Sequence, residues 1–126
     1  MSVPNGAIAS HVETARLPHP ELARQLVQHL GPTLVALIAN VRDRKLPHKW
    51  AQADGPRPRD PALARLQVAH RCWSMLATAE GSDTARSWFI GANPRLGEES
   101  PALTIREGRY AEVVAAAVAF VDGSEY

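Results

Sequence analysis

The sequence contains a single cysteine, Cys72, among its 126 residues. One cysteine excludes an internal disulfide framework and is typical of proteins from a reducing compartment. The apolar runs all fall short of the roughly 18 residues that a membrane helix needs, and no basic-then-apolar leader opens the chain. We therefore expect a cytoplasmic protein without membrane contact, whose fold rests on a hydrophobic core alone.

Motifs for catalysis and for metal binding are also missing. The five histidines are scattered, and no second pair of Cys or His residues accompanies His70 and Cys72. These two residues stand two positions apart on an expected helix and point in different directions, so they cannot share a metal ion. No glycine-rich phosphate loop and no nucleophile elbow occurs. We expect a protein that is not an enzyme and that carries no cofactor and no metal.

The residues that are present predict helices throughout. Proline stands near the start, and glycine just after the end, of several stretches whose apolar residues recur at helical spacing. No segment alternates apolar and polar residues for long enough to predict a strand. Asp60 is expected to cap the longest helix, and Ser82 or Asp83 the next one. The expected helices cover residues 20–30, 32–40, 61–80, 84–92, 101–107 and 109–121, with a shorter helical turn that begins at Pro47.

Composition divides this all-α chain into three parts. Residues 1–19 lack periodicity and are expected to form a loose N-terminal arm. Residues 20–60 hold two helices, a basic helical turn and a proline-rich connector, which together predict a helix-turn-helix-like unit. Residues 61–126 begin with the longest helix and end with an apolar one, which predicts a connecting helix and a C-terminal helical module.

The first helical unit is a candidate for binding DNA. In a helix-turn-helix the second helix enters the major groove, and its polar side chains contact bases and phosphates. Between residues 41 and 65 the chain has seven basic and three acidic residues, a net charge of +4. Pro47 shortens the second helix, so the unit is degenerate, and a solvated basic loop is the alternative. The candidate DNA-binding residues are Arg42, Arg44, Lys45, His48, Lys49, Gln52, Arg57 and Arg59.

The last expected helix is apolar on nearly all sides. Tyr110, Val113 and Ala117 lie on one face, and Val114 and Val118 lie on a second. We expect such a helix to be covered by its own core on one side and by a partner chain on the other. The alternative is a terminal helix inserted centrally in a small bundle. From residue 81 onward four arginines stand against seven acids, a net charge of −3, so this part of the chain predicts an acidic surface.

Short steps at fixed spacing link the last three expected helices. A helix ends in a tryptophan and a bulky apolar residue, an Asn-Pro turn and a Leu-Gly step follow, and a Ser-Pro helix start precedes a glycine. These steps are Trp88-Phe89, Asn93-Pro94, Leu96-Gly97, Ser100-Pro101 and Gly108. Together with the apolar helix that follows, residues 84–121 resemble the toxin-binding domain of the Xre/MbcA/ParS family of antitoxins. Glu98 stands where a small residue is common in that family, and Ala102 where a larger apolar residue is usual.

The resemblance implies a function that involves a partner enzyme. Family members carry an Xre-like helix-turn-helix upstream, and they neutralise a RES-domain toxin, an enzyme that consumes NAD, by covering its active site. The implied partners are a cognate RES-domain toxin, a second copy in a homodimer or a higher-order toxin–antitoxin complex, and operator DNA for autoregulation. The acidic C-terminal part suits the electropositive pocket of an enzyme that binds anionic NAD.

The candidate toxin-binding residues come from the C-terminal part of the chain. They are Arg95, Arg106, Arg109, Tyr110, Glu112, Val114, Val118, Val121, Glu125 and Tyr126. The alternative function is that of a DNA-binding transcriptional regulator whose C-terminal helices only dimerise it. The two functions differ in what the last helix contacts, a toxin or a second copy of the chain.

Overall fold

The computed structural model describes residues 14–123, and all regular structure in that range is helical, with no strand. The all-α fold expected from the sequence is therefore confirmed. Residues 14–16 form a short helical turn. The elements that follow are α2 (His19–Leu30), α3 (Pro32–Ala39), α4 (Leu46–Trp50), α5 (Asp60–Glu80), α6 (Ser82–Ile90), the 3₁₀ turn η1 (Pro94–Leu96), α7 (Pro101–Arg106) and α8 (Tyr110–Asp122).

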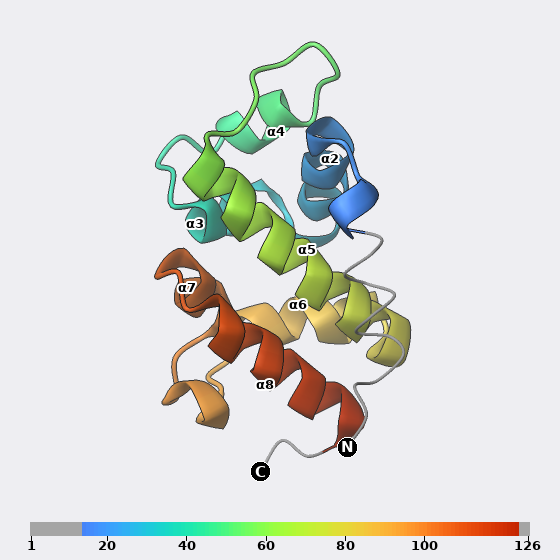
Figure 1. The fold of residues 1–126 in the computed structure, drawn as a ribbon, viewed down its shortest axis with the longest axis vertical. Coiled ribbons are helices and arrows are strands. Elements are labelled where there is room, and N and C mark those ends of the chain that lie inside the picture. The colour runs from blue at the N-terminus through green and yellow to red at the C-terminus, as the bar shows by residue number, and fades with distance from the viewer. Residues whose placement is uncertain (1–13, 124–126) are drawn as a thin grey trace.

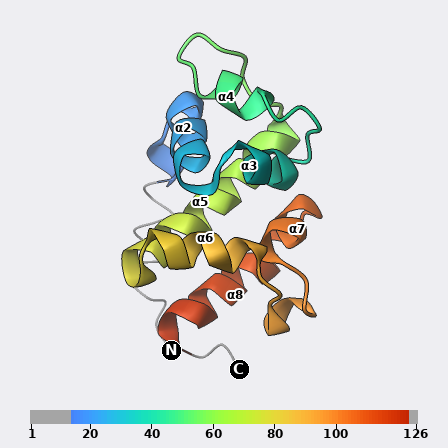
Figure 2. The same cartoon turned by 180° about the vertical axis from the view of Figure 1, so that it is seen from behind.

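The long helix α5 runs diagonally through the molecule and joins its two ends (Figures 1 and 2). Helices α2, α3 and α4 form the end of the molecule at which α5 begins, and α6, α7 and α8 form the other end (Figures 1 and 2). Helix α7 also contacts α3, so the two ends touch directly as well as through α5. The core consequently lies along α5, between the two groups of helices.

Helix α5 is buried on more sides than its sequence predicts. Leu66 and His70 are four positions apart, so the helical period places them on one face of α5, and both are fully buried. Ala69, Cys72 and Met75 are buried as well, although they project from other sides of the helix. The short side chains of alanine and cysteine fit where neighbouring helices approach α5 from opposite directions. Helix α5 is buried on several sides because it lies at the centre of the bundle. The helical period of its sequence predicts only one buried face.

Two glycines make the sharp turns between consecutive helices. Gly31 separates α2 from α3 with φ 84° and ψ 153°, and Gly81 separates α5 from α6 with φ 92° and ψ 160°. These dihedral angles lie in a region that is essentially open to glycine only. The expected side-chain caps are therefore corrected: Arg59 and Gly81 occupy the N-cap positions of α5 and α6, and neither helix start has a side-chain capping hydrogen bond.

Part of the expected N-terminal arm belongs to the core. Residues 1–13 of that arm lie outside the described residues. Thr14 is buried, and its hydroxyl lies 2.7 Å from Nδ1 of His70 on α5. Nε2 of the same imidazole lies 2.7 Å from Oε1 of Gln25 on α2. His70 therefore connects the start of the described chain with the two helices that pack against each other at this point.

Candidate functional site

The eight candidate DNA-binding residues are all exposed and come from one stretch of chain. That stretch, residues 41–59, forms the end of the molecule that carries α4 and the loops on either side of it (Figure 1). We call it the basic end. These are the basic and polar side chains that the sequence analysis names as candidates: Arg42, Arg44, Lys45, His48, Lys49, Gln52, Arg57 and Arg59.

The geometry of the basic end departs from that of a regular helix-turn-helix. Six residues, 40–45, separate α3 from α4, whereas the motif uses a turn of about 3–4 residues. Helix α4 has only five residues, and Pro47 and Trp50 on its inner side are buried. Gln52 lies beyond the end of α4, whereas the sequence predicts it on the helical turn that begins at Pro47. Most of the basic side chains therefore belong to loops that flank α4.

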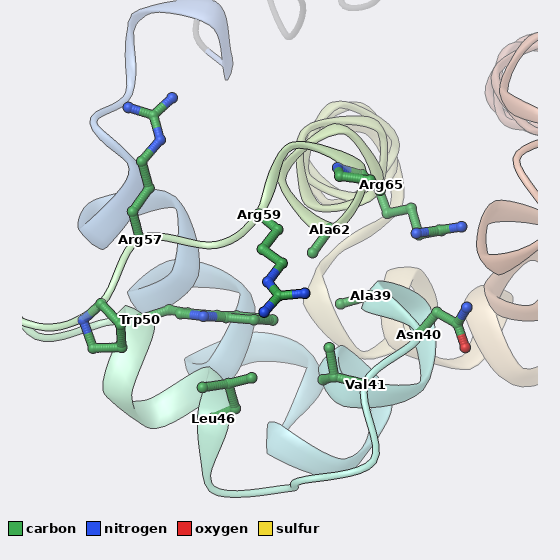
Figure 3. Close-up of a pocket in the computed structure, with 11 residues that line it drawn as sticks. Ala39, Asn40, Val41, Leu46, Trp50, Arg57, Arg59, Ala62 and Arg65 are labelled. Atoms are coloured by element: carbon green, nitrogen blue, oxygen red, sulfur yellow. The ribbon is translucent and has the colours of Figure 1, made fainter.

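A pocket of about 490 Å³ lies beside α4, between the end of α3 and the start of α5 (Figure 3). We call it the Trp50 pocket. Arg59 extends into it, and its guanidinium lies next to one end of the Trp50 ring (Figure 3). Arg57 and Arg65 also belong to the lining, but their side chains point away from its centre. The lining residues are Ala39, Asn40, Val41, Leu46, Trp50, Pro56, Arg57, Arg59, Pro61, Ala62 and Arg65.

Sequence reasoning missed Arg65 and Asn40 as members of this pocket. Arg65 lies away from the apolar face that the helical period of α5 predicts, and its Nε donates a 3.0 Å hydrogen bond to the backbone carbonyl of Arg106. Asn40 ends α3 in the left-handed conformation, with φ 61°, where asparagine is one of the favoured residues. An asparagine after an apolar helix is a signal for that helix end, but nothing local signals the pocket.

The C-terminal module, residues 84–121, gives each step of its sequence pattern a structural role. The side chains of Trp88 and Phe89 are buried, and their rings meet edge to face at 5.2 Å. Asn93 accepts a hydrogen bond from the backbone amide of Arg95 at 2.9 Å, which starts η1. Ser100 accepts one from the amide of Leu103 at 3.2 Å, which starts α7. The aromatic residues thus anchor the module, and the Asn-Pro and Ser-Pro steps begin its short helices.

Left-handed backbone conformations explain three further positions of this pattern. Gly97 has φ 65° and Gly108 has φ 83°, and each follows the end of a short helix. Glu98 has φ 69°, which is uncommon for a residue with a side chain. The Glu98 amide donates to the Asn93 carbonyl at 2.9 Å, which closes the turn. The backbone at this position therefore favours glycine, which has no Cβ.

Two of the candidate toxin-binding residues are partners of each other. The Arg109 guanidinium donates to Glu112 from Nε at 3.1 Å and lies 3.4 Å from a carboxylate oxygen of Glu99. The hydrogen bond from Arg109 lowers the pKa of Glu112. A hydrogen bond with Glu107 raises the pKa of Glu99. Arg109 therefore belongs to a surface cluster of glutamates and is occupied within its own chain.

The remaining candidate toxin-binding residues differ in exposure. Arg95 and Arg106 are exposed, and Tyr110 is half-buried. The three valines are half-buried and pack partly against the core of their own chain: Val114, Val118 and Val121. Glu125 and Tyr126 lie outside the described residues.

The expected apolar outer face of the last helix is smaller than the sequence predicts, because Val114 and Val118 are half-buried. The outward side of α8 carries Ala111, Glu112 and Ala115, all exposed, while its large apolar residues pack inward at least in part. The large apolar residues that are exposed among residues 14–123 are Ile90 on α6, at 56%, and Leu103 on α7, at 38%. The sequence overestimated the free apolar surface of α8 because α5 and its neighbours cover much of its circumference.

Within residues 14–123, no three His, Cys, Asp or Glu side chains gather in a way that could hold a metal ion. None of the helices in that range has both the length and the apolar composition required to cross a membrane. Comparison of the chain with protein-family models, with characterised proteins and with solved structures finds no match. The basic end and the C-terminal module hold the candidate binding residues.

Proposed function

We propose that this protein is a non-catalytic antitoxin that binds a RES-domain, NAD-consuming toxin and covers its active site. The observation that carries the proposal is the resemblance of residues 84–121 to the toxin-binding domain of the Xre/MbcA/ParS antitoxins. Support comes from the conformations of that stretch. Caps at Asn93 and Ser100 and left-handed turns at Gly97 and Gly108 supply physical reasons for the shared residues.

Charge adds a second line of support. From residue 81 onward the chain has a net charge of −3, and the entrance of a site that receives anionic NAD attracts negative charge. Such complementarity raises association rates and fixes the orientation of a complex more than it raises affinity. The outward side of α8, around Glu112 and Ala115, is the surface that we assign to the toxin. Short side chains there let the toxin surface approach the helix closely.

The experiment first asks whether a RES-domain protein is encoded beside this chain, since its absence would count against the proposal. That protein is then co-expressed with this chain, with binding, cellular NAD and growth as measurements. The wild type is expected to restore both. Ala115→Arg places a long charged side chain on the outward side of α8 and is expected to abolish the rescue. Ala79→Arg is the matched control, because Ala79 is also exposed on a helix, and it is expected to rescue as the wild type does. Rescue by the folded Ala115→Arg variant would refute the assigned surface, and a lack of binding by the wild type would refute the function.

A second candidate function, DNA binding, is favoured by the exposure of every candidate residue at the basic end. Binding to phosphates releases counterions, so the affinity of a DNA-binding protein falls with salt at a log–log slope of about −0.9 per phosphate contact. Fluorescence anisotropy with a labelled duplex of the upstream DNA measures that slope. The combined change Arg42→Glu and Lys49→Glu is expected to remove binding, with Arg86→Glu on α6 as the control. Absence of wild-type binding at ~50 mM salt would exclude this function.

A further inference from the structure

The Trp50 pocket combines an apolar floor with a cationic rim. Its volume of about 490 Å³ falls in the range of roughly 300–1,000 Å³ that is usual for small-molecule sites. Trp50, Leu46 and Val41 supply apolar surface from α4 and the loop before it. Arginines supply the rim, and no Asp or Glu belongs to the lining formed by the described residues. An anion with an apolar body is the ligand that such a lining complements.

Arg59 is the cation placed to meet that anion. Its side chain extends over the pocket beside the Trp50 ring (Figure 3), and among the described residues it takes part in no ion pair. Arg57 points away from the pocket (Figure 3), and Arg65 points toward α7, where its Nε is held by the Arg106 carbonyl. One guanidinium therefore faces the centre of the pocket. A single guanidinium matches a single carboxylate in charge and in its two parallel hydrogen bonds.

We propose that the Trp50 pocket binds a small organic carboxylate with a flat apolar body. The carboxylate pairs with Arg59, and the body covers the apolar floor formed by Val41, Leu46 and the edge of Trp50. The first turn of α5, which begins at Asp60, forms the adjoining wall through Pro61 and Ala62. A phosphate monoester fits less well, because its second charge has no second guanidinium facing the pocket. This binding site is independent of the toxin partner proposed above.

The test uses 3-phenylpropionate as the probe and the backbone amide signals of the ¹⁵N-labelled full chain as the readout. Saturable shifts are expected together at Val41, Leu46 and Ala62, which line the pocket from separate parts of the sequence. The neutral amide of the probe has the same body without the charge. It is expected to bind at least about tenfold more weakly, as the loss of a charged hydrogen bond predicts. Acetate has the charge without the body and is expected to bind more weakly still.

Variants assign the charge to one side chain. Arg59→Gln is expected to weaken binding of 3-phenylpropionate about tenfold. Because Arg59 is exposed, the substitution is expected to leave the protein folded. Arg86→Gln, a matched change at an exposed arginine on α6, is expected to leave the affinity unchanged. Equal binding of the probe and its amide, or an Arg59→Gln variant that titrates as the wild type does, would overturn the proposal. Shifts at these amides with duplex DNA and none with 3-phenylpropionate would also overturn it, because Arg59 would then serve nucleic acid.

Discussion

At the scale of single residues, His70 shows how a polar side chain is accommodated in this core. Gln25 donates from Nε2 to Glu21 at 3.1 Å, which turns its Oε1 toward His70. His70 therefore donates from Nε2, and its Nδ1 accepts from the Thr14 hydroxyl. The sequence excluded this histidine from a metal site. Its structural role became evident only when residues 56 and 45 positions away in the chain were placed beside it.

Replacement of His70 by alanine is expected to destabilise the protein by about 2–4 kcal/mol. The change leaves a cavity in the core and removes a partner from both Thr14 and Gln25. His48→Ala is the matched control, since His48 is exposed on α4, and it is expected to change stability by less than about 0.5 kcal/mol. Urea unfolding followed by circular dichroism measures both. Equal, small effects of the two changes would contradict the structural role of His70.

Cys72 is fully buried on α5, and burial raises the pKa of its thiol to about 12, against a smaller opposing effect of Arg71. The thiolate is the reactive form, so the folded protein is expected to resist iodoacetamide at pH 8 and to react once unfolded. Mass spectrometry with and without urea measures the adduct. Rapid labelling of the native protein would show that the thiol is accessible.

The same shift in the pKa of Cys72 has a consequence for stability at high pH. The unfolded thiol has a pKa of 9.0 and the folded one of about 12, so the folded state binds the proton more tightly between these values. The contribution of Cys72 to stability is thus complete below pH 9 and is lost as the pH rises toward 12, at up to about 1.4 kcal/mol per pH unit. Urea unfolding between pH 8 and 10.5 is expected to show a smaller loss in Cys72→Ala than in the wild type.

At the scale of secondary-structure elements, the junctions between helices depend on backbone conformation more than on caps. The chain passes from α5 to α6 through Gly81 alone, and from α2 to α3 through Gly31 alone. A Cβ added to either glycine would have nothing within 4 Å. The backbone conformation, and not crowding by neighbouring atoms, therefore requires glycine at these two positions. A one-residue junction also leaves no loop to absorb a change of angle.

Gly81→Ala is expected to destabilise the protein by about 1–3 kcal/mol, the cost of holding a side-chain-bearing residue in this part of φ/ψ space. Gly91→Ala is the matched control. Gly91 ends α6 with φ −83° and ψ 155°, angles open to alanine, and an added Cβ would lie 3.5 Å from the Ser87 carbonyl, an ordinary contact. Thermal unfolding is expected to show a lower Tm than that of the wild type for Gly81→Ala and an unchanged Tm for Gly91→Ala. Equal Tm values for the two variants would refute the conformational explanation.

At the scale of the whole molecule, a single hydrophobic cluster extends from α2 to α8. Along the chain, Leu22 is the first buried residue of this cluster and Ala117 the last, and α5 contributes to the core between them. The contact of α7 with α3, together with the hydrogen bond from Arg65 to Arg106, adds connections that bypass the length of α5. The basic end and the C-terminal module consequently share one core while presenting separate surfaces.

A shared core predicts one cooperative unfolding transition for both ends. Amide signals of Leu46, at the basic end, and of Val113, on α8, are expected to disappear with the same midpoint in urea. Removal of residues 109–126 would take Val113, Ala116 and Ala117 out of the core. The truncated chain is therefore expected to lose the fold of the basic end as well. Separate midpoints, or a folded truncated chain, would show two independent units.

Much of the fold follows from the sequence by itself. Prolines at helix starts and glycines at helix ends are local signals, because each acts through its own φ angle and hydrogen-bonding groups. Helices α2, α3, α5 and α6 accordingly begin and end within two residues of the expected positions. The exposure of basic side chains also follows from the local sequence, since basic residues in a polar stretch remain in water. The basic side chains of the basic end are exposed for that reason.

Only the tertiary structure decided how these elements meet. The valines of α8 could have faced a partner, but α5 and its neighbours cover them in part. Arg109 could have been free for a partner, but the turn before α8 places it among glutamates. The Trp50 pocket exists because the start of α5 lies beside α3 and α4. Helical period describes one helix at a time, whereas coverage, ion pairs and pockets depend on the angles and distances between helices.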